Sequence, residues 1–135
     1  LNPNDVTDRS YLVQVPEFER ELGPDESWFA VFVTAFNESD EAHPSATEFE
    51  IVDTQDTVYR PIQLGEDNVF AYRPAEVEAG EQNPPMNSAA ANNPTVNGGL
   101  LLFKVKNDSF DNRPLELRIH AAEGTPEEAA VDLDV

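Results

Sequence analysis

Two short turns of the sequence carry the residues with the clearest chemical potential. Residues 53–56 (DTQD) offer two carboxylates, an amide and a hydroxyl, and residues 107–112 (NDSFDN) offer a similar set. Calcium takes about six to eight oxygen ligands of these kinds from loop positions. The candidate calcium ligands are Asp53, Asp56, Asp108 and Asp111. Neither turn has EF-hand spacing, and the alternative is that these side chains cap their turns by accepting hydrogen bonds from nearby backbone N–H groups.

No other set of residues indicates catalysis. The chain has no cysteine, which excludes thiolate chemistry and cysteine-bound metals. Its two histidines, His43 and His120, come from distant segments, so surface or internally hydrogen-bonded histidines are favoured over a shared metal site. No catalytic pair stands out among the 27 acidic residues, and there is no G-x-S-x-G motif or glycine-rich phosphate loop. We predict that the chain is not an enzyme and, calcium apart, binds no cofactor.

The net charge limits the class of partner. Eight Lys and Arg residues against 27 Asp and Glu residues give a formal charge of −19. Nucleic acids and anionic membranes must be met by cations, so the charge argues against both partners. Two explanations of the acidity stay open: a solvated surface, or adaptation to a high-salt habitat in which counterions screen the carboxylates. Because like charges oppose association, we expect a monomer or a weak oligomer.

The hydrophobic pattern predicts strands and no convincing helix. Residues 28–36 (WFAVFVTAF) are apolar on both faces, which is typical of a central strand covered on both sides. Its aromatic side chains fit a core better than the alternative, a ligand groove. A hairpin is expected at residues 48–60, and Pro61 ends it. The expected strands, besides residues 28–36, are residues 11–15, 48–52, 57–60, 68–72, 100–106, 115–120 and 129–135.

The alternation within two of these segments also predicts which side chains face the core. The predicted inward residues are Leu101, Phe103, Val105, Leu115, Leu117 and Ile119. Seven or eight strands separated by turns indicate an all-β sandwich or barrel, and 135 residues fit one domain. We expect residues 1–9 to be a disordered lead-in or linker remnant, and residues 10–135 to form the domain. The Pro-, Gly- and Asn-rich loop at residues 76–99 is either mobile or partly paired as an irregular edge strand.

The order of these segments resembles a bacterial family of exported immunoglobulin-like β-sandwich domains, typified by the mycobacterial immunoprotective antigen. The resemblance covers roughly residues 10–135. The loop at residues 76–99 is longer than the turn usual in that family. The matching segments are the strand and turn at residues 28–40, the hairpin FEIVDTQDTVY at residues 49–59, the strand at residues 100–105, the L-x-L-x-I strand at residues 115–119 and the V-x-L-x-V strand at residues 131–135.

The resemblance implies an immunoglobulin-like antiparallel sandwich of seven or eight strands. It also implies an extracytoplasmic location, secreted or anchored by an N-terminal segment absent from this chain, as in the lipoprotein-associated members of unknown function. It brings no catalytic residues. The expected function is a non-catalytic module that interacts with a protein or envelope component, or that serves as a structural spacer. The alternative is a sandwich domain that binds a small ligand or calcium.

Overall fold

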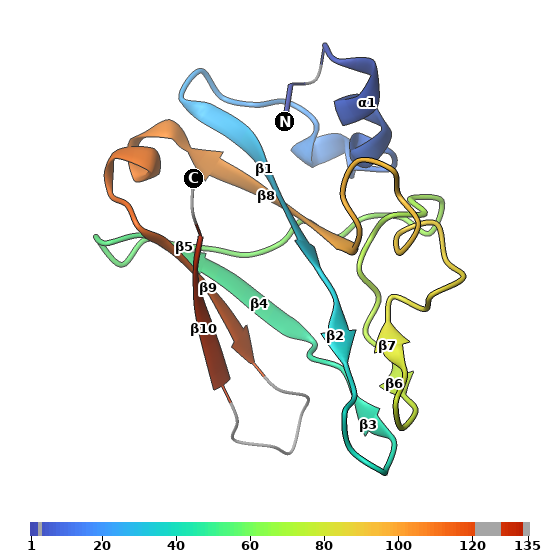
Figure 1. The fold of residues 1–135 in the computed structure, drawn as a ribbon. Helices are drawn as coiled ribbons and strands as arrows, with labels where there is room; N and C mark the ends of the chain where they lie inside the picture. Colours follow the sequence, from blue (N-terminus) through green and yellow to red (C-terminus); the bar gives the residue numbers. More distant parts are fainter. Residues whose placement is uncertain (3, 121–127, 134–135) are drawn as a thin grey trace.

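Strands make up most of the regular structure in the computed structural model, which describes residues 1–2, 4–120 and 128–133 (Figure 1). The helical part is small: one turn of α-helix, α1 (Val6–Arg9), and short 3₁₀ turns at Ser10–Leu12, Glu17–Glu19 and Asn107–Asp111. In the described ranges no helix has the length and apolarity to cross a membrane. The strands are β1 (Glu26–Val33), β2 (Ala35–Phe36), β3 (His43–Pro44), β4 (Glu48–Val52), β5 (Val58–Tyr59), β6 (Glu76–Val77), β7 (Gln82–Asn83), β8 (Gly99–Lys106), β9 (Leu115–His120) and β10 (Glu128–Leu133).

Strand β8 is hydrogen-bonded along both of its edges. On one side it pairs with β1 in antiparallel register, from Glu26 opposite Lys106 to Val33 opposite Gly99. On the other side it meets irregular backbone: the Ile62 N–H donates to the Leu102 carbonyl at 2.7 Å, and the Leu100 N–H donates to the Phe70 carbonyl at 2.7 Å. At Leu100 and Leu102, β8 therefore has backbone partners on both sides, although only β1 is a regular strand partner.

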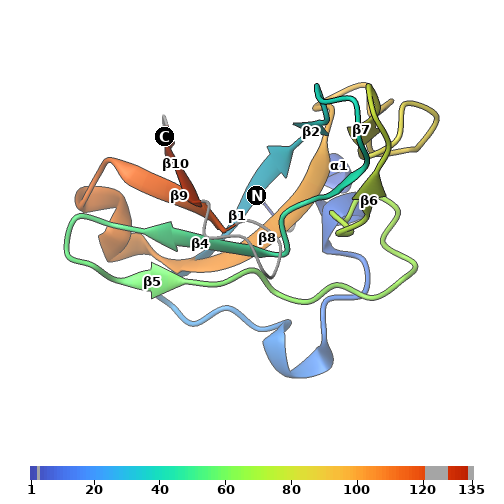
Figure 2. The ribbon, with the colours of Figure 1, turned by 90° about the horizontal axis from the view of Figure 1, so that it is seen from below.

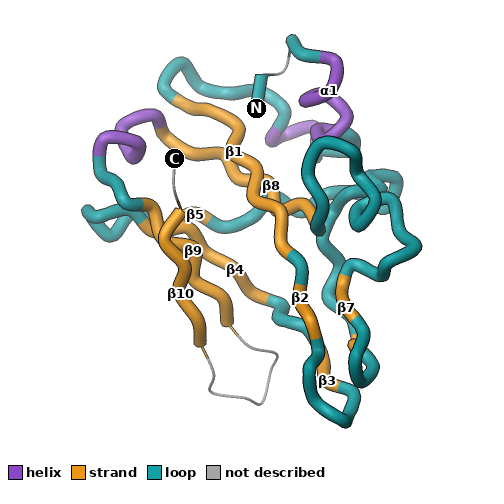
Figure 3. The backbone as a smooth tube through the Cα atoms, in the orientation of Figure 1, coloured by secondary structure: helices purple, strands orange, loops and turns teal. Residues whose placement is uncertain are grey.

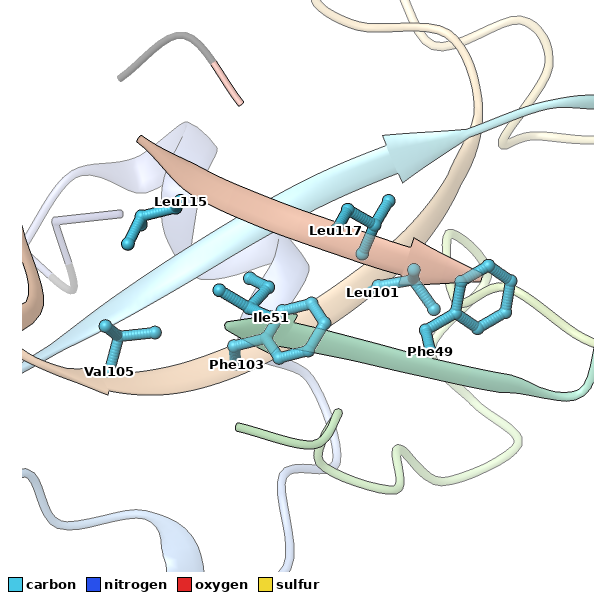
Figure 4. Close-up of a cluster of buried hydrophobic side chains, with 7 residues drawn as sticks. All are labelled: Phe49, Ile51, Leu101, Phe103, Val105, Leu115 and Leu117. Carbon is cyan, nitrogen blue, oxygen red and sulfur yellow. The ribbon is translucent and has the colours of Figure 1, made fainter. Parts of the chain in front are cut away.

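The main hydrophobic core lies between β8 and a second sheet of strand order β10-β9-β4-β5. Alternate side chains of β8 point towards β4 and β9 and interdigitate with theirs (Figure 4). The predicted inward faces of both segments are confirmed, with Ile119 only partly buried. The buried members of this core are Phe49, Ile51, Leu101, Phe103, Val105, Leu115 and Leu117.

A second hydrophobic cluster covers the opposite face of β8. Leu100 and Leu102 of β8 contact Trp28 of β1, and the cluster is closed by the N-terminal segment and by residues 62–71. Its buried members are Tyr11, Val15, Trp28, Leu64, Leu100 and Leu102. This arrangement explains why residues 28–36 are apolar on both faces, since β1 contributes side chains to both clusters. The expected cover on both faces is confirmed, but the central position within a sheet was wrong, because β1 pairs with β8 alone among the described strands.

The N-terminal residues differ from the expectations. Residues 1–9, expected to be disordered, include α1, which Asp5 caps by accepting hydrogen bonds from the N–H groups of Thr7 and Asp8. Residues 11–15, expected to be a strand, begin in a 3₁₀ turn and contain Gln14 at a φ of 58°, which no extended strand allows. Tyr11 and Val15 are buried in the second cluster through side-chain packing and not through strand pairing, whereas Val13 is exposed.

Further along the chain the expected strands are shorter or absent. Residues 68–72 form only an isolated parallel bridge between Ala71 and Leu100. The loop at residues 76–99 follows the second of its two alternatives, since β7 pairs with β2 (Figure 3) and β6 pairs with β3 (Figure 1). The last strand begins at Glu128, one residue before the expected start, and positions 134–135 of the prediction lie outside the described residues.

Replacing Phe103 by alanine tests the main core. The Phe103 side chain is fully buried between the two sheets, and truncation of a buried phenylalanine leaves a cavity. We expect Phe103→Ala to lower the free energy of unfolding by about 3–5 kcal/mol, measured by urea denaturation. Phe18→Ala is the matched control, because Phe18 is 85 % exposed and its loss is expected to change stability by less than about 0.5 kcal/mol. Equal effects of the two substitutions would contradict this core.

Candidate functional site

The first of the two acidic turns is organised by Asp53, which follows β4. Its Oδ1 accepts hydrogen bonds from the backbone N–H groups of Gln55 and Thr57, both at 2.9 Å. Asp56 occupies the left-handed region at a φ of 64°, where aspartate is better tolerated than most residues. Asp53 therefore caps the turn between β4 and β5, which was the alternative to a calcium ligand.

The second acidic turn packs directly against the first. The Ser109 hydroxyl donates to Asp53 Oδ2 at 2.7 Å, and Tyr59 OH lies 2.6 Å from Ser109 Oγ. Because the serine proton is directed at the carboxylate, the tyrosine is the donor of that second bond. The two turns are also joined through backbone, where the Thr54 N–H donates to the carbonyl of Asn112 at 3.0 Å. The sequence pointed to two separate turns, and the structure brings them together around one buried carboxylate.

Two opposing effects set the pKa of the Asp53 carboxyl. Burial is the largest single effect and raises the pKa, because it removes water from the charged form. Hydrogen bonds from Ser109 and from the backbone N–H groups of Thr57 and Gln55 favour the charged form, and together they outweigh burial. The pKa of Asp53 consequently lies below its ordinary value of 3.8.

The remaining candidate calcium ligands do not complete a cluster around Asp53. Both of its oxygens already accept protein hydrogen bonds. Asp56, Asp108 and Asp111 lie in the same two turns, but within residues 1–2, 4–120 and 128–133 no group of three or more His, Asp or Glu side chains is arranged to hold a metal ion. Calcium binding at these turns stays a prediction.

A cleft opens beside β4, where the ladder between β4 and β5 stops. Strand β5 lies beside β4 (Figure 2), and the ladder pairs Ile51 with Tyr59 and Val52 with Val58. The same register would place residue 61 opposite Phe49. Residue 61 is proline, which has no N–H to donate. The chain leaves β4 at this point and bonds to β8 through Ile62.

The departure leaves one edge of β4 without a strand partner. Backbone groups of successive strand residues point alternately to the two neighbouring strands. The Asp53 N–H points to the β5 side, where it donates to the Thr57 carbonyl at 3.2 Å. Ile51 and Phe49, at steps of two residues, point to the same side. The N–H and C=O of Phe49 are therefore directed to an edge that β5 does not reach.

The space beside this edge is a cleft of about 570 Å³. Its apolar lining comes from both sheets and from residues 61–74, and includes Phe49, Ile62, Leu64, Tyr72, Leu100 and Leu101. The Tyr72 hydroxyl donates to the Ala46 carbonyl at 2.7 Å. Burial raises the pKa of Tyr72 against the opposing hydrogen bonds of Ser45 and Asn83, so the phenol is neutral at neutral pH.

Charged side chains gather at the cleft around Glu50. Its Oε1 lies 2.7 Å from His120 Nε2, and its Oε2 lies 3.2 Å from Arg60 Nη2. The Arg60 side chain is 77 % exposed, whereas that of Glu50 is 19 % exposed. The carboxylate is thus held by two partners from β9 and from the end of the β4–β5 hairpin, and the guanidinium remains accessible from solvent.

Sequence reasoning missed this cleft. His120 was interpreted as a surface or hydrogen-bonded histidine, and its bond to Glu50 confirms the second description. The aromatic residues of 28–36 were weighed as an alternative groove, but Trp28, Phe29 and Phe32 pack in the two clusters, and only Phe36 is largely exposed. The one signal that could have located the cleft is Pro61 following the hairpin.

Comparisons with known proteins give no relative from which to read this site: no family model matches the chain, and neither a curated protein nor a solved structure matches it.

Replacing Asp53 by asparagine tests the buried carboxylate. Hydrogen bonds to a charged group contribute about 1.5–3 kcal/mol, so we expect Asp53→Asn to lower the free energy of unfolding by that order at pH 7. A pKa lowered by folding adds stability above the unfolded-state pKa, and this is lost as the pH falls through the folded-state value. The stability difference between wild type and variant should therefore shrink below about pH 4.

The control for this substitution is Asp56→Asn in the same turn, measured by the same urea denaturation series. Asn tolerates the left-handed conformation of residue 56, so we expect a change of less than about 0.5 kcal/mol at every pH. A difference for Asp53→Asn that is small, or that grows as the pH falls, would show that Asp53 does not hold the two turns together as a carboxylate.

Proposed function

We propose that this chain is a non-catalytic, exported binding module with an immunoglobulin-like β-sandwich fold, and that it binds an extended segment of a partner protein or envelope component along the open edge of β4. The sandwich is supported by the shared core, because β8 and the four-stranded sheet bury side chains between them. The resemblance of the segment order to exported bacterial domains supports the location. A role as a structural spacer is compatible with the same fold but makes no use of the cleft.

The observation that carries the proposal is the unpaired side of Phe49. An extended peptide can add to a free strand edge through main-chain hydrogen bonds, while neighbouring pockets select its side chains. The N–H and C=O of Phe49 face this edge, and the apolar lining of the cleft lies directly beside it. An added strand would take the place that Pro61 prevents the chain itself from filling.

The cleft has the mixed lining that such recognition requires. Apolar side chains of β8 form one part of its wall, and Glu50, Arg60 and His120 supply polar groups around it. A few polar groups placed around an apolar pocket fix the orientation of a ligand. The net charge of −19 favours partners that are neutral or basic in bulk over nucleic acids or anionic membranes.

A second candidate function is the binding of a small organic ligand in the same cleft. Its volume of about 570 Å³ falls within the range of about 300–1,000 Å³ that is typical of small-molecule sites. Such a ligand would need no strand-like backbone, so it would leave the edge groups of Phe49 bonded to water.

Filling the cleft tests the proposal. Thr47 is exposed and lines the cleft, so Thr47→Trp places a large ring at its entrance without disturbing the core. The probe is a random peptide library displayed on phage and panned against the immobilised wild-type chain. We expect the enriched peptides to bind Thr47→Trp about tenfold or more weakly than the wild type, which corresponds to the loss of roughly one good contact. On the wild-type chain, the same peptides should protect the Phe49 amide from hydrogen exchange.

The matched control is Thr54→Trp, an identical exchange at an exposed position of the β4–β5 turn. It should bind the enriched peptides as the wild type does. Strand addition at β4 would be contradicted if no peptide were enriched, or if the enriched peptides bound Thr47→Trp as tightly as the wild type. Binding that leaves the Phe49 amide unprotected would contradict it as well.

A further inference from the structure

A second, shallower hollow of about 580 Å³ adjoins the cleft. The two share three lining residues, Gln63, Leu64 and Arg73, so the hollow and the cleft lie next to one another. The rest of its wall comes from Gly65 and Glu66 and from residues 14–20 of the N-terminal segment, which is far from β4 in the sequence. The hollow is therefore a place where a separate part of a bound ligand can be recognised.

The two walls of the hollow are fixed by a close approach of backbone. The Gly65 N–H donates to the carbonyl of Gln14 at 3.2 Å, and Gln14 itself has a φ of 58°. A Cβ atom at position 65 would lie 1.8 Å from Gln14 Oε1, so only glycine fits without a shift of the neighbouring side chain. The hollow is thus held by specific contacts between two segments and is not only a gap between loops.

Two arginine side chains line this hollow, and each is held by backbone carbonyls. Arg73 donates from Nη1 to the Leu64 carbonyl at 3.1 Å and from Nη2 to the Gly65 carbonyl at 2.7 Å. Arg20 donates from Nε to the Val15 carbonyl at 3.0 Å. In the part of the chain that the structure describes, neither guanidinium has a carboxylate within 4.0 Å. Carbonyls position the two cations without neutralising them.

This arrangement is unusual for a chain of charge −19 with only eight Lys and Arg residues. Two of its six arginines line one hollow, where Glu66 is the acidic residue of the lining. A guanidinium has five N–H donors in a planar fork that matches a carboxylate. Most donors of Arg20 and Arg73 remain after their carbonyl bonds, and the groups are already oriented, which lowers the entropy lost on binding.

We propose that this hollow is an anion-binding subsite, in which Arg20 and Arg73 bind a carboxylate of the ligand whose extended part lies in the cleft. The inference rests on the proposed function and sharpens it: the partner segment carries an acidic side chain or a terminal carboxylate beyond the residues that add to β4. The two guanidinium groups supply the local positive charge that a carboxylate needs against a net charge of −19.

The test is an NMR titration of the ¹⁵N-labelled chain with glutarate, followed at the Gly65 amide in the hollow. Inorganic phosphate and sodium chloride at equal ionic strength are the parallel arms. We expect a saturable shift of Gly65 with glutarate, weakened about tenfold in Arg20→Gln and in Arg73→Gln, as the loss of one charge-assisted contact implies. Thermal melts of each variant verify that the fold is intact. Arg73→Gln removes hydrogen bonds to the carbonyls of residues 64 and 65, so if its melting temperature falls, the comparison rests on Arg20→Gln.

Arg9→Gln is the control, since it removes the same charge from an exposed position of α1 outside the hollow. Arg9→Gln should weaken the binding of glutarate by less than about twofold, because a distant charge is screened by salt. The carboxylate subsite would be overturned if all three variants lost glutarate affinity equally, or if sodium chloride reproduced the shift of Gly65. It would also be overturned if phosphate gave a saturable shift of Gly65 and glutarate gave none. If selected peptides protect Phe49 but bind Arg20→Gln and Arg73→Gln unchanged, the subsite fails while the binding function of the β4 edge stands.

Discussion

The missing N–H of Pro61 is the constraint on which the arrangement around the cleft depends. In the register of the β4–β5 hairpin, position 61 lies opposite Phe49, and a proline there cannot donate to the next rung of the ladder. The chain instead crosses to β8, where the Ile62 N–H finds the Leu102 carbonyl. Pro61 thus ends the hairpin and leaves the side of β4 at Phe49 open. The chain that departs from β4 at this residue gives the second edge of β8 a partner, through Ile62.

The structure around this point is held rigidly on both sides. Strand β8 is buried on both faces, with one cluster against the four-stranded sheet and another against the N-terminal segment. At the far end of the hairpin, the Asp53 carboxylate joins the two acidic turns through Ser109 and Tyr59. The open edge therefore lies between a fixed turn and a fixed strand, which is the condition for a pre-formed binding site.

The sequence predicted the parts of this fold that follow from local pattern. Alternation located the inward face of β9, whose other side carries the polar residues Glu116, Arg118 and His120. It also located the side chains that β8 contributes to the main core, although Leu100 and Leu102 on the other face of β8 are buried as well. It failed at residues 11–15, where β-forming residues are buried by tertiary contacts: the Tyr11 ring packs edge-on against Phe32 and Phe70, and its hydroxyl accepts a hydrogen bond from Asn93. Nothing in the local sequence specifies those long-range partners.

The candidate site was predictable only in fragments. The turns of Asp53 and Ser109 were identified, but their contact depends on how β5 lies against residues 107–111, which no spacing reveals. Pro61 was identified as the end of a hairpin, yet the open edge follows from the position of β8. Arg20 and Arg73 are remote in the chain, and only the fold places them in one hollow.

The most direct test of this account is native-state hydrogen exchange at two amides of β4. The Ile51 N–H faces β5 within the ladder, whereas the Phe49 N–H faces the open edge. We expect the Phe49 amide to exchange about a hundredfold or more faster than the Ile51 amide, since an amide at an unpaired edge can exchange without global unfolding of the chain. Pro61→Val restores the N–H that would donate to the Phe49 carbonyl, and so allows the ladder to extend by one pair. The carbonyl of residue 61 would then accept a hydrogen bond from the Phe49 N–H, so the substitution should slow exchange at Phe49 towards the rate at Ile51. Equal protection of the two amides in the wild type would contradict the account, because it would mean that the edge of β4 is already paired.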